Sequence, residues 1–175
     1  MDEAEAIMKN KELKQLFNDV FSFLKVDYGF DVISSKVDRW GYRFLGKNLT
    51  TGIKVIYEVR EACIYVFLYK LIDGEIYHNF YHALKNDEKE QMLGFALDWI
   101  IELKDPEAQI KPTYEYDDGP DSPFYDKENG FRNYAESVAE KLRKYGDEVM
   151  RGDFSVFEPL DAIVKDYYRD YYKNN

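Results

Sequence analysis

Gly41-Tyr-Arg-Phe-Leu-Gly-Lys47 and Gly52-Ile-Lys-Val-Ile-Tyr-Glu-Val59 alternate apolar and polar residues. A period of two is typical of β-strands that cover a core with one face. The following segment, residues 62–72, has apolar residues at both odd and even positions, so both faces of a strand there would be apolar. This is typical of a strand inside a sheet. Asp73-Gly74 then matches the residue preference of a two-residue hairpin turn. Together these segments predict an antiparallel meander.

The parity of the apolar residues predicts how the strands pair. We expect a four-residue hairpin loop at residues 48–51 and a two-residue loop at Arg60-Glu61, or a longer loop of even length. These lengths place one apolar row on a single face of three strands: Tyr42, Phe44, Val55, Tyr57, Ile64 and Val66. A slip of one residue would turn that row to the other face. With residues 31–40 as a first strand, four or five antiparallel strands are expected between residues 30 and 79.

Apolar residues at three- and four-residue spacing predict four helices, at residues 4–26, 87–104, 130–150 and from residue 158 onward. Gly29 suits the left-handed end of the first helix. Asp87 and Glu90 have the spacing of a capping box at the start of the second. We therefore expect a single α+β domain over residues 1–175: an antiparallel meander with an N-terminal helix and C-terminal helices packed on it. Because residues 62–72 are apolar at both parities, helices are expected on both faces of the sheet.

The composition limits the classes of partner. The chain has 175 residues and a formal net charge of −10. This charge argues against nucleic-acid binding, which needs Lys and Arg on the phosphates, and it favours attraction to basic proteins. The N-terminus has no apolar leader, and no run of about eighteen apolar residues exists. We expect no membrane association and, by default, cytoplasmic localisation; the oligomeric state stays open.

Residues 105–128 differ from the rest of the chain. They include four prolines, and their eight acidic and two basic residues give a balance of −6. Tyrosines alternate with the carboxylates, a combination that suits recognition of a basic protein partner. The candidate partner-binding residues are Tyr114, Glu115, Tyr116, Asp117, Asp118, Asp121 and Tyr125.

Three other interpretations of this segment stay open. Residues 117–121 resemble part of a calcium loop but lack its ligand spacing. Two carboxylates of the segment could serve a glycosidase, although nothing sets their separation. The third interpretation is a solvated connection that uses its aromatic residues to attach to the body of the protein.

Other candidate sites are sparse. His78 and His82 are the two histidines, and on a strand they would lie some 13 Å apart, too far to share a metal. Cys63 is the one cysteine and is expected to be buried in the apolar strand. We predict no metal site, no cofactor and no catalytic residue. Arg39 beside Trp40 forms a possible cation–π platform. A second functional hypothesis is therefore an enzyme or small-ligand-binding protein with a pocket near Arg39, Trp40 and His78.

Several motifs resemble a pattern in small uncharacterised bacterial proteins. They are Ser122-Pro-Phe-Tyr125, Asn129-Gly130, Gly152-Asp-Phe-Ser-Val-Phe157 with Leu160-Asp161, and Glu58-Val-Arg-Glu61. In size, acidity and α+β composition the chain also resembles immunity proteins of contact-dependent toxin systems. That resemblance implies an acidic protein-binding module that neutralises a basic toxin by occlusion, and this is the first functional hypothesis.

Overall fold

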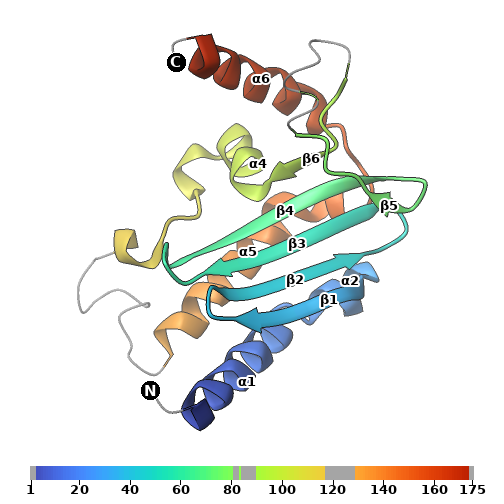
Figure 1. Ribbon diagram of the computed structural model, residues 1–175. Coiled ribbons are helices and arrows are strands. Elements are labelled where there is room, and N and C mark those ends of the chain that lie inside the picture. The colour runs from blue at the N-terminus through green and yellow to red at the C-terminus, as the bar shows by residue number, and fades with distance from the viewer. Residues whose placement is uncertain (1–2, 81–82, 84–89, 117–128, 174–175) are drawn as a thin grey trace.

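The computed structural model describes residues 3–80, 83, 90–116 and 129–173 (Figure 1). A mixed α+β architecture is present, with a helical N-terminus, a meander and C-terminal helices. The strands are β1 (Asp31–Asp38), β2 (Gly41–Lys47), β3 (Thr51–Glu58), β4 (Cys63–Ile72), β5 (Glu75–Ile76) and β6 (Gly94–Ala96). The helices are α1 (Glu3–Val20), α2 (Phe23–Tyr28), α4 (Leu97–Lys104), α5 (Gly130–Met150) and α6 (Phe157–Lys173), with short 3-10 turns η1 (Pro106–Ala108) and η2 (Thr113–Tyr116).

The predicted strand pairing is confirmed. The strands follow the order β1-β2-β3-β4, and both β5 and β6 pair with β4. Tyr42 lies opposite Tyr57, and Val55 lies opposite Val66. The β3–β4 loop has four residues, since Glu58 pairs with Cys63. Its even length keeps the apolar row on one face.

The β4–β5 turn follows the residue preference seen in the sequence. Asp73 and Gly74 have φ values of 52° and 77°. Positive φ at both central residues defines a type I′ turn, which matches the twist of the flanking strands. The predicted hairpin at this position is therefore confirmed.

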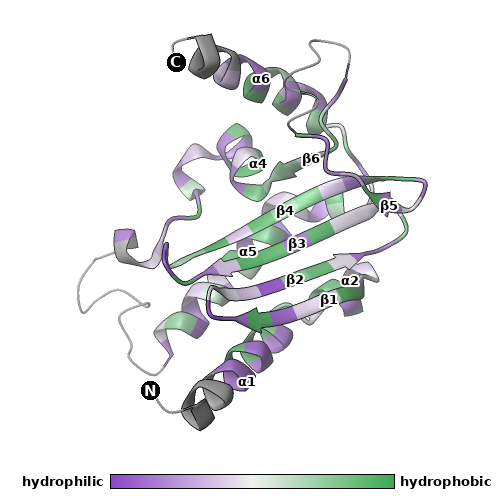
Figure 2. Ribbon diagram, in the orientation of Figure 1, coloured by the Kyte–Doolittle hydropathy of each residue, from purple (hydrophilic) through white to green (hydrophobic). Residues whose placement is uncertain are grey.

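The helical layer lies on one face of the sheet. In Figure 1, α1 and α5 pass behind the strands, and Figure 2 shows hydrophobic residues concentrated in the central strands. Ile53, Ile64 and Leu68 are fully buried beneath these helices. The expectation of helices on both faces is wrong for most of the described sheet, because helices reach the opposite face only at its β4–β6 edge, through α4 and α6. The apolar residues on that face of β4 border a pocket instead.

The predicted first helix is divided into two. α1 ends at Val20 and α2 begins at Phe23. Between them the Ser22 hydroxyl donates a hydrogen bond to the Asp19 carbonyl oxygen at 2.8 Å, and such side-chain bonds compete with the helical ladder. Gly29 has a φ of 68° after α2, which confirms the predicted left-handed end.

The predicted helix at residues 87–104 is wrong in its first half. Residues 94–96 form β6, and the helix α4 begins at Leu97; residues 84–89 lie outside the described residues. The Lys70 amide donates to the Leu93 carbonyl oxygen at 2.7 Å. Hydrogen bonding to the free edge of β4 therefore overrides the helical periodicity of this segment.

The core confirms the expected burial of Cys63, which is only 2% exposed. Burial raises the pKa of its thiol. Tyr134 is also fully buried; its hydroxyl accepts from the Ile64 amide and donates to the Lys111 carbonyl oxygen. Of the helices in the described part of the chain, none is long and apolar enough to cross a membrane.

Candidate functional site

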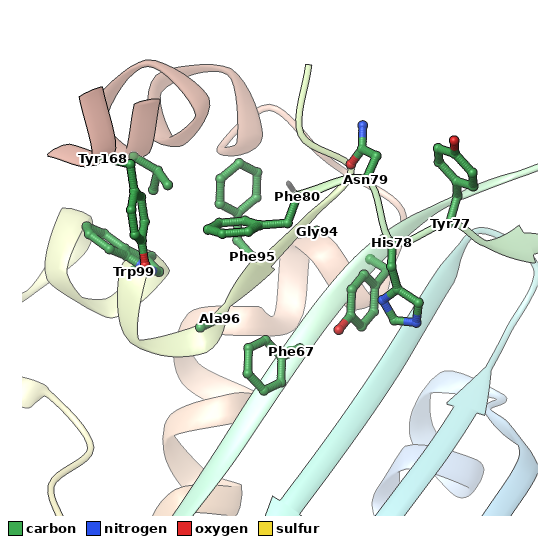
Figure 3. Close-up of a pocket in the computed structure, with 12 residues that line it drawn as sticks. Phe67, Tyr77, His78, Asn79, Phe80, Gly94, Phe95, Ala96, Trp99 and Tyr168 are labelled. Carbon is green, nitrogen blue, oxygen red and sulfur yellow. The ribbon is translucent and has the colours of Figure 1, made fainter. Parts of the chain in front are cut away.

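A pocket of about 310 Å³ lies where the outward face of β4 and β6 meets α6 and the segment after β5 (Figure 3). Aromatic side chains form most of its wall. The residues that line it are Phe67, Tyr69, Tyr77, His78, Asn79, Phe80, Gly94, Phe95, Ala96, Trp99, Val164 and Tyr168. The pocket thus draws on four separate regions of the sequence.

The register between β4 and β6 forms the floor of this aromatic pocket. Phe67 pairs with Ala96 and Tyr69 pairs with Gly94, so each ring lies opposite a small residue. A Cβ atom added at Gly94 would lie 2.2 Å from Cδ1 of Tyr69. Only glycine leaves room for the Tyr69 ring to cross β6.

Asn79 holds the segment after β5 against the start of β6. Its side-chain amide donates to the Gln91 carbonyl oxygen at 2.9 Å, and its side-chain oxygen accepts from the Leu93 amide at 3.0 Å. Asn79 is only 3% exposed. Because these bonds imitate strand pairing, they fix His78 and Phe80 on either side of Asn79 at the rim of the pocket.

The helix α6 closes another side of the pocket. Tyr168 meets Phe80 edge to face, with ring centroids 5.4 Å apart. Asp161 accepts a hydrogen bond from the Met92 amide at 2.8 Å, and Lys165 donates to the Glu90 carbonyl oxygen at 2.7 Å. These polar contacts tie α6 to the segment that leads into β6. The pocket is therefore formed by packed and hydrogen-bonded elements.

Burial favours the uncharged forms of His78 and Tyr69. The His78 ring meets the Tyr69 ring edge to face at 4.8 Å. Burial, followed by the positive charge of Lys54, lowers the pKa of His78 below its usual value. Burial also raises the pKa of Tyr69 to about 12. Neutral imidazole and phenol groups can donate and accept hydrogen bonds without adding charge to the site.

The pocket offers a largely aromatic wall with a few polar groups, a composition typical of ligand pockets. A catalytic histidine is normally oriented by a third group such as a carboxylate. Within the described ranges, His78 makes no hydrogen bond to a carboxylate, and no group of three or more potential metal ligands is found. His82 lies outside the described residues.

The structure does not bring the residues of the second hypothesis together. Trp40 lines a separate hollow with Arg43, Glu58, Arg60 and Glu61. This hollow lies by the β1–β2 and β3–β4 turns, whereas His78 follows β5 toward the other end of the sheet (Figure 1). The predicted cation–π contact is present, with the Arg39 guanidinium carbon 4.6 Å from the Trp40 ring centroid. The predicted pocket near Arg39, Trp40 and His78 is therefore not formed. Of these three residues, only His78 lines the aromatic pocket.

Part of the acidic segment packs against the body of the protein. Ile110 is buried, and Asp105 accepts a hydrogen bond from the Tyr145 hydroxyl at 2.5 Å. The Thr113 amide donates to the Ala62 carbonyl oxygen at 3.0 Å, which holds η2 beside the β3–β4 turn. Of the candidate partner-binding residues, Tyr114, Glu115 and Tyr116 belong to η2, and the Glu115 side chain is exposed. The other four, Asp117, Asp118, Asp121 and Tyr125, lie outside the described residues.

Sequence reasoning missed most of the aromatic pocket. It did not single out Phe67 or Tyr69. The available signal was the second row of apolar residues in 62–72, at the odd positions. This row places Phe67 and Tyr69 on the face of the sheet away from the core. That row was interpreted as a surface for helices rather than as the wall of a pocket.

Comparisons with known proteins add no relative. No protein-family model matches the chain, and no curated protein or solved structure is similar to it. The resemblance to small bacterial proteins and to immunity proteins therefore stays a prediction.

Proposed function

We propose that this protein binds a small planar aromatic molecule in the aromatic pocket. The observation that carries the proposal is a preformed apolar cavity whose wall holds several rings and a neutral histidine. Its volume of about 310 Å³ is at the lower end of the range for ligand pockets, roughly 300–1,000 Å³. Aromatic rings pack best in offset or edge-to-face geometry against other rings. A flat aromatic ligand that packs among the lining rings satisfies that preference.

A change of Ala96 to leucine is expected to block this binding. Ala96 lines the pocket and lies opposite Phe67, so a larger side chain fills the cavity. The neutral probe 2-naphthamide should bind the wild-type protein with a Kd on the order of 0.1–1 mM. The measurement is a titration followed by the NMR chemical shift of the Trp99 indole. We expect Ala96→Leu to weaken the binding of 2-naphthamide at least about tenfold.

Ala162→Leu serves as the matched control, because Ala162 is exposed on α6. It should leave the affinity for 2-naphthamide unchanged. Cyclohexanecarboxamide, which has a saturated ring, should bind more weakly than 2-naphthamide. Equal binding of 2-naphthamide to wild type and Ala96→Leu would contradict the proposal.

A second candidate function is an acidic module that binds a basic protein, with neutralisation of a toxin by occlusion as its mechanism. The observation in its favour is the placement of η2 beside the β3–β4 turn. Trp40 is 38% exposed there, and Val59 is 49% exposed. Exposed Trp and Arg residues beside carboxylates have the composition of a protein-binding surface.

Neutralising the acidic segment tests this second function. Changing Asp117, Asp118 and Asp121 together to asparagine should slow association with a basic partner at low salt by about tenfold or more, because opposite charges steer encounter. The measurement is the association rate of whichever basic protein the immobilised wild type captures from its host. A control that removes three helical carboxylates, Glu12, Glu140 and Glu158, changes the net charge equally. Equal association rates for the two triple variants would count against the acidic segment as the contact surface.

A further inference from the structure

We propose that the ligand of the aromatic pocket is an aromatic carboxylate, whose ring enters the pocket while its carboxylate pairs with Lys54 on the adjoining face of β3. This inference rests on the proposed function and names its substrate class.

Lys54 borders the pocket by strand register. It pairs with Phe67, which lines the pocket, and with Leu45 on its other side. Directly opposed residues in antiparallel strands have Cβ atoms about 4.5–5.5 Å apart. Lys54 therefore extends from the outward face of the sheet immediately next to the pocket wall, between two apolar neighbours.

Two cations on the same face, Arg43 and Lys47, are paired with carboxylates, and Lys54 is not. The Arg43 guanidinium lies 2.5 Å from an Asp38 carboxylate oxygen, and the Lys47 ammonium lies 2.9 Å from that of Glu75. Within the described part of the chain, Lys54 has no ion-pair partner and no side-chain hydrogen bond. Lys54 is half-buried as a residue, and its ammonium group can form a charge-assisted hydrogen bond with an anion that arrives with the ligand.

Two neutral donors complete the anion site. The Tyr69 hydroxyl has no hydrogen-bond partner among residues 3–80, 83, 90–116 and 129–173. Its raised pKa keeps it protonated, so it can donate to a carboxylate oxygen. The His78 ring packs against Tyr69 and lies close enough to Lys54 for that charge to lower the pKa of His78. One cation and two neutral donors beside an aromatic cavity match a ring that carries a single anionic group.

The test compares 2-naphthoate with its neutral counterpart 2-naphthamide by calorimetric titration at low ionic strength. Wild-type protein should bind 2-naphthoate about tenfold more tightly than 2-naphthamide, the size expected for a charged hydrogen bond. Lys54→Met keeps the apolar stem and removes the charge, so it should reduce the ratio of 2-naphthoate affinity to 2-naphthamide affinity from about ten to about one. Lys36 is exposed on β1, on the same face of the sheet as Lys54. Lys36→Met should therefore preserve the preference for 2-naphthoate.

The outcomes separate this inference from the proposed function. Equal affinities of wild type for both probes, or a preference that survives Lys54→Met, would overturn the carboxylate assignment while aromatic binding stands. Binding of neither probe would overturn the proposed function, and the carboxylate assignment would fall with it.

Discussion

Replacing Phe17 with alanine is expected to lower the free energy of unfolding by about 3–5 kcal/mol. Phe17 is fully buried and stacks on Tyr42 of β2, with ring centroids 4.2 Å apart. It also meets Phe131 of α5 at 6.0 Å. The ring therefore joins α1 to both the sheet and α5, and its removal leaves a cavity where three elements meet.

Urea unfolding followed by far-ultraviolet circular dichroism measures this loss. Val26→Ala is the control on α2, because Val26 is 80% exposed and its truncation should change the free energy of unfolding by less than about 0.5 kcal/mol. A loss below about 1 kcal/mol for Phe17→Ala would mean that α1 contributes little to the core.

Replacing Asn79 with alanine is expected to lower the free energy of unfolding by about 1–3 kcal/mol, because two part-buried hydrogen bonds to backbone groups are lost. The Gln91 carbonyl oxygen and the Leu93 amide both bond the Asn79 side chain. Since these bonds hold the rim of the pocket, the variant should also lose affinity for 2-naphthamide. Urea unfolding and the naphthamide titration measure the two effects on the same sample.

Two further variants sharpen the Asn79 experiment. Asn18→Ala, at an exposed position of α1, should change the free energy of unfolding by less than about 0.5 kcal/mol. Asn79→Asp keeps the acceptor for the Leu93 amide, but it puts a second carboxylate beside Glu90, to which the Asn79 amide donates at 3.1 Å, and it should therefore be at least as destabilising as Asn79→Ala at pH 7. Full stability and full ligand binding in Asn79→Ala would show that the hydrogen bonds of the Asn79 side chain do not hold the pocket together.

The meander was predictable because its information is local. Alternation along residues 41–59 sets which side chains share a face, and even loop lengths carry that choice from strand to strand. Asp73-Gly74 was predictable for the same reason, since its backbone requires residues that tolerate positive φ. The register of Tyr42 with Tyr57 follows from these local features alone.

Residues 90–96 were not predictable, because a distant element determines their conformation. Their apolar spacing is compatible with a helix, yet β4 offers unpaired backbone groups, and Lys70 bonds Leu93. Asn79 adds two more bonds to the same segment. None of these partners is near residues 90–96 in the sequence, so periodicity within the segment could not reveal them.

The sequence by itself determined the strands of the meander, their faces and the acidity of residues 105–128, because each depends on neighbouring residues or on composition. Only the tertiary structure decided that β6 joins β4, that Trp40 and His78 belong to different sites, and that rings from β4, α4 and α6 surround one cavity. The physical reason is that a pocket is a property of surfaces brought together by packing. The side chains that form it come from segments whose contacts no local pattern encodes.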